Sequence, residues 1–192
     1  MEKSLIRERL LKERLVLNPS DVVFKSNIIA NRIISSTLFK NADNIALYSD
    51  FRAEVKTGLM IDAALSLGKR VLLPKVRRGD YSIVFIPIQS YDELGRGDEG
   101  FLEPLAEVEK AFDVSKIDLF IVPGVAYDLS GTRLGLGKGC YDRALKNVDR
   151  DIVLAPAYEF QVLEDLPCYK HDFKVGWLAT EDRFVKTVFK EN

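Results

Sequence analysis

The sequence predicts an α/β protein built as a single domain, in which helices flank a mainly parallel central sheet in a Rossmann-like, three-layer arrangement. Two observations support this fold class. Short apolar runs of the kind that form buried strands alternate with helical patterns over most of the chain. The 192 residues, 47% hydrophobic and 30% charged, also match one ordinary globular domain. We therefore expect one unit over residues 1–192, with N-terminal helices at residues 2–39 packed on the sheet.

The first N-terminal helix is expected over residues 2–17, because apolar side chains recur there at helical spacing. These side chains are Leu5, Ile6, Leu10, Leu11 and Leu15. The segment 18–21, Asn-Pro-Ser-Asp, is a turn and cap signal. A second helix is expected to follow it and to end at about Phe39.

The first helix also carries basic residues, of which Lys3 and Arg7 stand four apart and therefore share one side. The pattern alone indicates a solvated basic face for both. The remaining basic residues with the same interpretation are Arg9, Lys12 and Arg14.

The expected strands are short apolar runs bounded by polar or turn residues, and they lie at 45–48, 71–74, 81–87, 118–122, 152–155 and 177–180. The strand at 71–74 follows an expected helix at 56–67, so it should run parallel to the strand at 45–48. The strand at 81–87 follows a short turn through Gly79-Asp80, which favours an antiparallel pairing.

A glycine-rich stretch at residues 131–143 carries the strongest functional signal. Gly135, Gly137 and Gly139 stand at every second position, and Arg133 and Lys138 add positive charge. A long loop is expected here, between the strand at 118–122 and a helix at about 141–148. Glycines let backbone N–H groups approach an anion, and a helix N-terminus adds a positive dipole end. The stretch therefore predicts phosphate or other anion binding, with a flexible surface turn as the alternative.

Two common phosphate motifs do not match this stretch. A Walker A loop has four residues between its first glycine and Gly-Lys, whereas five separate Gly131 from Gly137 here. The dinucleotide fingerprint, counted from Gly135, needs a glycine where the chain has Cys140. The loop is therefore a basic glycine-rich loop of another kind.

Composition excludes several classes of protein. The net charge of -1 argues against a general nucleic-acid coat. Two cysteines, Cys140 and Cys168, and the single His171 make a disulfide framework or a zinc site improbable. The sequence has neither an apolar run long enough for a membrane span nor an apolar signal core. We expect a cytoplasmic, monomeric enzyme with small-molecule partners, without nucleic acid or membrane.

Two further acids invite a chemical interpretation. Glu54 lies in a strand-to-helix loop, where α/β proteins place ligands, although an acid before a helix also complements the helix dipole. The His171-Asp172 pair could suggest acid–base chemistry, but no serine or cysteine nucleophile motif accompanies it. Cys140 has no activating base in the sequence pattern.

The central stretch resembles the signature of a known family. Arg-Leu-Gly-x-Gly-x-Gly-x-Tyr-Asp at 133–142, preceded by Val-Pro-Gly-Val-Ala-Tyr-Asp-x-x-Gly at 122–131, is similar to the motif of 5-formyltetrahydrofolate cyclo-ligases. Matching positions appear in the family's order over nearly the whole chain, from Lys3 and Arg7 through Glu54 to Asp172. The resemblance implies ATP-dependent cyclisation of 5-formyltetrahydrofolate to 5,10-methenyltetrahydrofolate, through a phosphorylated formyl intermediate, with release of ADP and phosphate.

The resemblance also implies a role for each matching residue. Arg133 and Lys138 would be catalytic, and Asp142 and Asp172 would hold Mg²⁺. The implied ATP-binding residues are Lys3, Arg7, Arg133, Leu134, Gly135, Leu136, Gly137, Lys138, Gly139, Cys140 and Tyr141. The implied substrate-binding residues are Tyr48, Glu54, Leu136, Gly137, Lys138, Gly139 and Cys140, with Glu54 accepting hydrogen bonds from adjacent donors of the pterin.

Two alternatives stay open at this point. One is another ATP- or sugar-phosphate-using α/β enzyme that shares the anion loop but not the folate pocket. The other is a non-catalytic paralogue of the family with a thiamine-linked or RNA-binding role. A strongly basic surface or a missing magnesium acid would favour the paralogue, but Asp142 and Asp172 are both present and the net charge is near zero.

Overall fold

The computed structural model describes residues 2–77, 79–97 and 100–188, and within them the main sheet has seven strands. Its order is β12-β11-β9-β6-β1-β2-β3. The strands are β1 (Asn44–Ala46), β2 (Arg70–Val76), β3 (Ile83–Ile88), β6 (Leu119–Ile121), β9 (Val153–Pro156), β11 (Trp177–Ala179) and β12 (Phe184–Lys186). Neighbouring strands are parallel in the pairs β11–β9, β9–β6, β6–β1 and β1–β2. The edge strands β3 and β12 run antiparallel to their neighbours. The expected α/β class, the mainly parallel sheet and the antiparallel β3 are confirmed.

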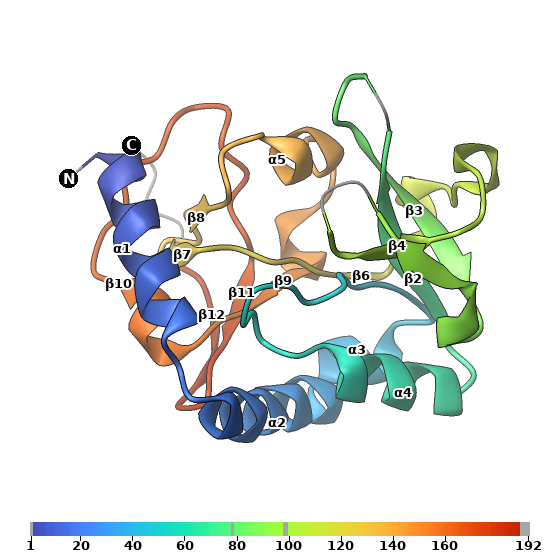
Figure 1. The fold of residues 1–192 in the computed structure, drawn as a ribbon, viewed down its shortest axis with the longest axis horizontal. Helices are drawn as coiled ribbons and strands as arrows, with labels where there is room; N and C mark the ends of the chain where they lie inside the picture. Colours follow the sequence, from blue (N-terminus) through green and yellow to red (C-terminus); the bar gives the residue numbers. More distant parts are fainter. Residues whose placement is uncertain (1, 78, 98–99, 189–192) are drawn as a thin grey trace.

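Five α-helices lie within the described residues: α1 (Lys3–Leu15), α2 (Pro19–Ser35), α3 (Thr37–Asn41), α4 (Gly58–Ser66) and α5 (Cys140–Ala144). Figure 1 shows α2, α3 and α4 along one face of the sheet and α5 on the other. Alternate residues of β1 and its continuation supply both interfaces, because successive strand side chains point to opposite faces. Ile45 and Leu47 pack with Ile33 of α2, whereas Ala46 packs with Leu145 beyond α5.

The second expected helix is two helices, because Ser36 interrupts it. The Ser36 backbone is extended, with φ of −70° and ψ of 155°. Its hydroxyl accepts a hydrogen bond from the Phe39 N–H, so the residue caps the start of α3. No helix among the described residues is both long and apolar enough to cross a membrane.

α1 packs against a second, smaller sheet at one end of the molecule (Figure 1). This sheet has the order β10-β7-β8, formed by β10 (Val162–Leu163), β7 (Ala126–Asp128) and β8 (Arg133–Leu134). Ile6 and Leu10 of α1 pack with Ala126 and Leu134. This packing places α1 beside the glycine-rich stretch.

The glycine-rich stretch is not one long loop, because its first part forms the β7–β8 hairpin. Asp128 holds the turn: its Oδ1 accepts hydrogen bonds from the N–H groups of Ser130 and Thr132, and its Oδ2 accepts one from Leu166. Strands of two or three residues are too short to show a periodic pattern. The expected helix at 141–148 is also shorter, since α5 ends at Ala144.

The remaining elements are short. A two-stranded antiparallel sheet joins β4 (Leu94–Arg96) and β5 (Leu102–Pro104). The 3₁₀ helices of the described residues are η1 (Tyr91–Glu93), η2 (Val108–Lys110), η3 (Val114–Lys116), η4 (Arg150–Ile152) and η5 (Glu159–Gln161). The segments that follow the parallel strands β1, β2 and β6 meet at one edge of the sheet, where open α/β sheets bind ligands.

Candidate active site

A cavity of about 950 Å³ opens at this edge, and every residue that the sequence placed in the site lines it. These residues are Lys3, Arg7, Tyr48, Glu54, Arg133, Leu134, Gly135, Leu136, Gly137, Lys138, Gly139, Cys140, Tyr141, Asp142 and Asp172. They come from α1, the segment after β1, the stretch from β8 into α5, and the loop before β11. The structure therefore brings these segments together around one space, while their individual binding roles stay predictions.

Arg7 and Arg133 form a cationic wall of the cavity. Arg7 Nε donates to the Gly135 carbonyl at 2.8 Å. Arg133 is only 5% exposed, and its guanidinium donates to the Pro123 carbonyl at 3.2 Å and to Asp142 at 2.8 Å. Its Nε is buried without a hydrogen-bond partner among the residues the structure describes. A buried unpaired donor beside a cavity is a place where a bound anion or water would be favoured.

Gly137 and Gly139 let the loop turn beneath this wall. Their φ angles are +104° and +64°, in the left-handed region that favours glycine. A Cβ at Gly137 would lie 3.6 Å from the Arg7 guanidinium, so the backbone passes directly under that cation. The glycine backbone and Arg7 together make a positively charged surface suited to phosphate.

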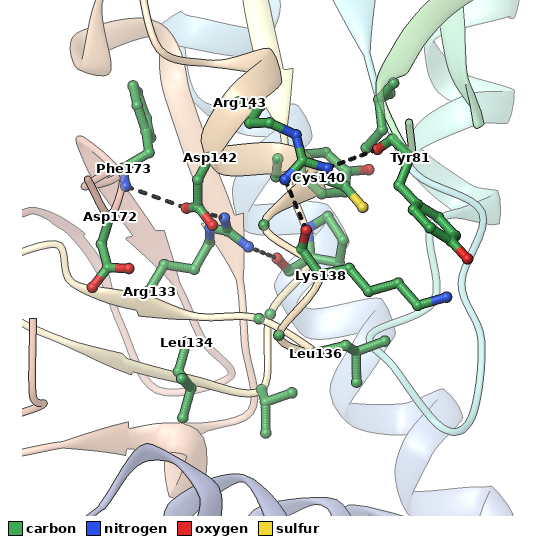
Figure 2. A pocket seen from close by; sticks show the side chains of 18 of the residues that line it. Tyr81, Arg133, Leu134, Leu136, Lys138, Cys140, Asp142, Arg143, Asp172 and Phe173 are labelled. Carbon is green, nitrogen blue, oxygen red and sulfur yellow. Dashed lines mark hydrogen bonds and ion pairs between the residues drawn. The ribbon is translucent and has the colours of Figure 1, made fainter. Parts of the chain in front are cut away.

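Asp142 and Asp172 lie together on one side of the cavity (Figure 2). Asp142 accepts a hydrogen bond from the Phe173 N–H at 3.2 Å and pairs with Arg133. Asp172 pairs with Lys3 and accepts a hydrogen bond from the Tyr169 N–H at 2.6 Å. Each carboxylate is thus held by one cation and one backbone N–H.

The two carboxylates fit a divalent cation only as part of a larger ligand set. The described residues contain no group of three or more His, Cys, Asp or Glu side chains placed to hold a metal ion. Mg²⁺ takes oxygen ligands and keeps several waters, and it is commonly bound by one or two carboxylates together with substrate phosphates. Asp142 and Asp172 suit that kind of site.

Glu54 also lines the cavity. Its side chain is 14% exposed, and its Oε2 accepts a hydrogen bond from the Phe51 N–H at 3.1 Å. Burial raises its pKa from 4.5 to about 7, although Arg14 and the Phe51 N–H act in the opposite direction. Tyr48 is 3% exposed and its hydroxyl donates to the Val55 carbonyl at 2.8 Å. Tyr48 therefore contributes ring surface, while its hydroxyl supports the loop.

The solvated face expected for Arg14 is wrong, because this side chain is 2% exposed. Its guanidinium lies 3.7 Å from Glu54 Oε1. A sequence signal did exist: Ile6, Leu10 and Arg14 stand four residues apart, so all three share the buried side of α1. The position was predicted to be exposed because arginine is charged, although the helical spacing indicates that it is buried.

Tyr81 and Arg143 line the cavity but carried no signal in the sequence. Lys138 Nζ lies 4.7 Å from the centroid of the Tyr81 ring. The Arg143 guanidinium donates to the carbonyls of Lys138, at 2.9 Å, and Tyr81, at 3.1 Å (Figure 2). The turn between β2 and β3 is thus attached to the glycine loop.

Apolar side chains line part of the cavity. Phe51 and Phe101 meet edge to face with their centroids 6.4 Å apart, and Val76 and Ile83 line the same cavity. His171 is 81% exposed at its side chain and stacks on Tyr169. His171 also lines the cavity, with its Nε2 3.9 Å from Asp172 Oδ1.

Comparison with known proteins points to one family. The family model described as the 5-formyltetrahydrofolate cyclo-ligase family matches residues 1–181. A curated 5-formyltetrahydrofolate cyclo-ligase from Mycolicibacterium smegmatis is 31% identical over 186 residues, covering 94% of each chain. The enzyme of that name from Escherichia coli K12 is 28% identical over 182 residues, covering 93% of this chain and 98% of its own.

Two solved structures are also similar to this chain. The solution structure of 5,10-methenyltetrahydrofolate synthetase from Aquifex aeolicus matches with a TM-score of 0.86 and 34% identity, covering 100% of this chain and 96% of its own. A 5,10-methenyltetrahydrofolate synthetase from Mycoplasma pneumoniae matches with a TM-score of 0.76 and 24% identity, which supports the fold alone. That likeness covers 94% of this chain and 99% of the other.

Proposed function

Because this chain belongs to the 5-formyltetrahydrofolate cyclo-ligase family, we propose that it converts 5-formyltetrahydrofolate to 5,10-methenyltetrahydrofolate in a reaction that requires ATP and Mg²⁺ and releases ADP and phosphate. The observation that carries the proposal is the joining, in one cavity, of a cationic glycine loop and a buried glutamate. The chain would act on small molecules as a cytoplasmic monomer.

Different lining residues of the cavity would contact the two substrates. The phosphates would lie at the glycine loop, where Lys3, Arg7, Arg133 and Lys138 line the wall. The pterin would lie against the apolar side chains, with adjacent ring N–H donors directed at Glu54. Phosphates need cations and backbone N–H groups, whereas a flat heterocycle needs apolar surface and a few polar groups that orient it.

The proposed chemistry activates a poor leaving group. The formyl oxygen attacks the γ-phosphorus, the bond from that phosphorus to the bridging oxygen breaks, and ADP leaves. N10 then attacks the formyl carbon, loses its proton, and phosphate departs with the former formyl oxygen. Phosphoryl transfer asks the protein mainly for positioning and charge neutralisation, which Arg133 and Lys138 would supply.

Asp142 and Asp172 would hold Mg²⁺, which when bound adds positive charge beside the transferring phosphoryl group. Arg133 and Lys3 pair with these same carboxylates, so both cations already lie beside the expected phosphate position. The orphaned Arg133 Nε supports this placement, because a phosphate oxygen would satisfy a donor that is otherwise buried and unpaired.

The direct test follows product formation by absorbance. Purified chain, 5-formyltetrahydrofolate and Mg-ATP are mixed, and the near-ultraviolet absorbance of the methenyl product is recorded. We expect it to grow only when all three are present. The proposal would be overturned if the folded protein gave no increase in this absorbance.

A variant separates this function from that of another ATP-using enzyme. Glu54→Ala should lose folate turnover while keeping nucleotide affinity, since the proposed phosphate contacts come from the cations and the glycine backbone and not from Glu54. Glu13→Ala, an exposed glutamate of α1, is the matched control and should keep both. Unchanged folate turnover in Glu54→Ala would count against the pterin placement.

A further inference from the structure

Arg14 is a buried cation that the proposed chemistry does not use. It lies in the last turn of α1 and is 2% exposed, on the same side of the helix as Leu10. Burying an arginine is costly unless its donors are satisfied and its charge is balanced. The partners of Arg14 therefore show what the position is for.

Each nitrogen of the Arg14 guanidinium contacts a different group. Nε donates to the Arg52 carbonyl at 3.1 Å, and one terminal nitrogen donates to the Gly124 carbonyl at 3.3 Å. The other terminal nitrogen lies 3.7 Å from Glu54 Oε1. Gly124 follows β6, and Arg52 and Glu54 lie in the segment after β1. One planar group thus joins α1 to two loops of the cavity wall, a task that suits the rigid fork of arginine.

The loop that Arg14 holds is strained. Arg52 and Ala53 are successive non-glycine residues with φ of 48° and 57°. Such a conformation is unfavourable for a residue with a Cβ atom, so the surroundings must enforce it. Arg14 holds the carbonyl of the first of them, and Glu54 follows directly. The bend therefore aims Glu54 at the cavity.

Arg14 also opposes the effect of burial on the ionisation of Glu54. Burial and the Asp50 carboxylate raise the Glu54 pKa, while Arg14 and the Phe51 N–H lower it, and the result is a pKa of about 7. The titratable or charged groups that face Glu54 from the packed elements are Arg14 of α1, Asp50 of its own loop, Tyr48 after β1, Tyr127 of β7 and Tyr141 of α5. Arg14 is the cation of this set.

We propose that Arg14 is a positioning residue of the site: its guanidinium holds the loop at residues 52–54 in its strained bend and keeps Glu54 available as a carboxylate toward adjacent N–H donors of a heterocyclic substrate. The inference rests on the proposed function for the identity of that substrate. Arg14 itself does not line the cavity, so it acts through Glu54.

The kinetic test compares Arg14→Gln, Arg14→Lys and the control Arg9→Gln over about pH 5 to about pH 9. Arg9 is an exposed arginine on the same helix. In Arg14→Gln, the acid limb of kcat/KM for 5-formyltetrahydrofolate should move to higher pH by about one unit or more. The folate KM at neutral pH should rise about tenfold or more, while the ATP KM changes less than about twofold.

Arg14→Lys keeps the charge but cannot contact all three groups at once. Its pH limb should stay close to that of the wild type, with the folate KM between those of the wild type and Arg14→Gln. Arg9→Gln should match the wild type. The proposal would be overturned if Arg14→Gln and Arg14→Lys raised the KM for folate and the KM for ATP equally, without shifting the acid limb of kcat/KM. Arg14 would then have a purely structural role. If Arg14→Gln does not fold, Arg14→Lys decides, because a wild-type folate KM there overturns the proposal.

A second measurement does not depend on turnover. The carboxyl carbon of Glu54 is titrated by NMR in the substrate-free wild type and in Arg14→Gln. The midpoint in Arg14→Gln shows whether the charge of Arg14 controls the ionisation of Glu54. A higher midpoint in Arg14→Gln supports the proposal, and a midpoint equal to that of the wild type overturns it. Absence of folate turnover in the wild type would instead overturn the proposed function and leave this titration valid.

Discussion

Replacing Glu54 with glutamine is expected to remove a pH-dependent destabilisation of the fold at neutral and alkaline pH. Burial raises the pKa of Glu54 from 4.5 to about 7, so the folded chain binds this proton more tightly than the unfolded chain does. The resulting contribution to stability is fully present below the unfolded pKa and is lost as the pH rises through the folded pKa. Ionised Glu54 therefore destabilises the fold, and glutamine cannot ionise.

The magnitude follows from the two pKa values. They differ by about 2.5 pH units, and one unit corresponds to about 1.4 kcal/mol, so ionisation costs about 3 kcal/mol at high pH. Relative to the wild type, the pH-dependent gain of Glu54→Gln should be about 3 kcal/mol at about pH 8 and about 1 kcal/mol at about pH 5.5.

Urea unfolding at both pH values measures this gain. Glu13→Gln, which alters an exposed glutamate of α1, is the control for removing a carboxylate. A difference between wild type and Glu54→Gln that is the same at both pH values would refute the reasoning. The same variant should lose folate turnover, so Glu54 would exchange stability for binding, as active-site residues often do.

Three further results are expected. Gly131→Ala should lower the unfolding free energy by about 2 kcal/mol or more in urea melts, because φ is +86° and a Cβ would lie 2.3 Å from the Val175 carbonyl. As the comparison for this variant, Gly79→Ala should lower the unfolding free energy by only about 1 kcal/mol, because φ is +105° there but the added Cβ would meet no atom within 4 Å. Lys3→Met should raise the KM for ATP about tenfold, whereas Lys12→Met, at an exposed position of the same helix, should leave it unchanged. The same KM for ATP in both variants would disprove the contact of Lys3 with the phosphates. EDTA should stop turnover and added Mg²⁺ should restore it, whereas full activity in EDTA would contradict the magnesium proposal.

The alternation of apolar runs and helical patterns was enough to predict the α/β class and the strands β1, β2, β3, β6, β9 and β11. A buried parallel strand such as β6 reads as a continuous apolar run, because both of its faces are covered. β7, β8 and β12 were missed, since two or three residues hold no measurable period. The break at Ser36 was missed because the apolar pattern continues across it.

The site was predicted from local motifs and from resemblance, and the two sources differ in what they can reach. The glycine loop with Arg133 and Lys138 is contiguous, so its charge and backbone freedom can be read directly. Lys3 and Asp172 are 169 positions apart, and only resemblance joined them before the structure did. The β2–β3 turn was predicted from Gly79-Asp80, but the contact of Tyr81 with the glycine loop was not, because the two segments are distant in sequence.

The sequence by itself determined the fold class and the family, and it predicted anion binding at the glycine loop, because periodicity, charge and motif are properties of neighbouring residues. Only the tertiary structure decided that Arg14 is buried and that Glu54 has a pKa near 7. Burial and electrostatic environment depend on what other segments place around a side chain. The same arginine that would be solvated on an isolated helix becomes, between two loops, the partner of a buried carboxylate.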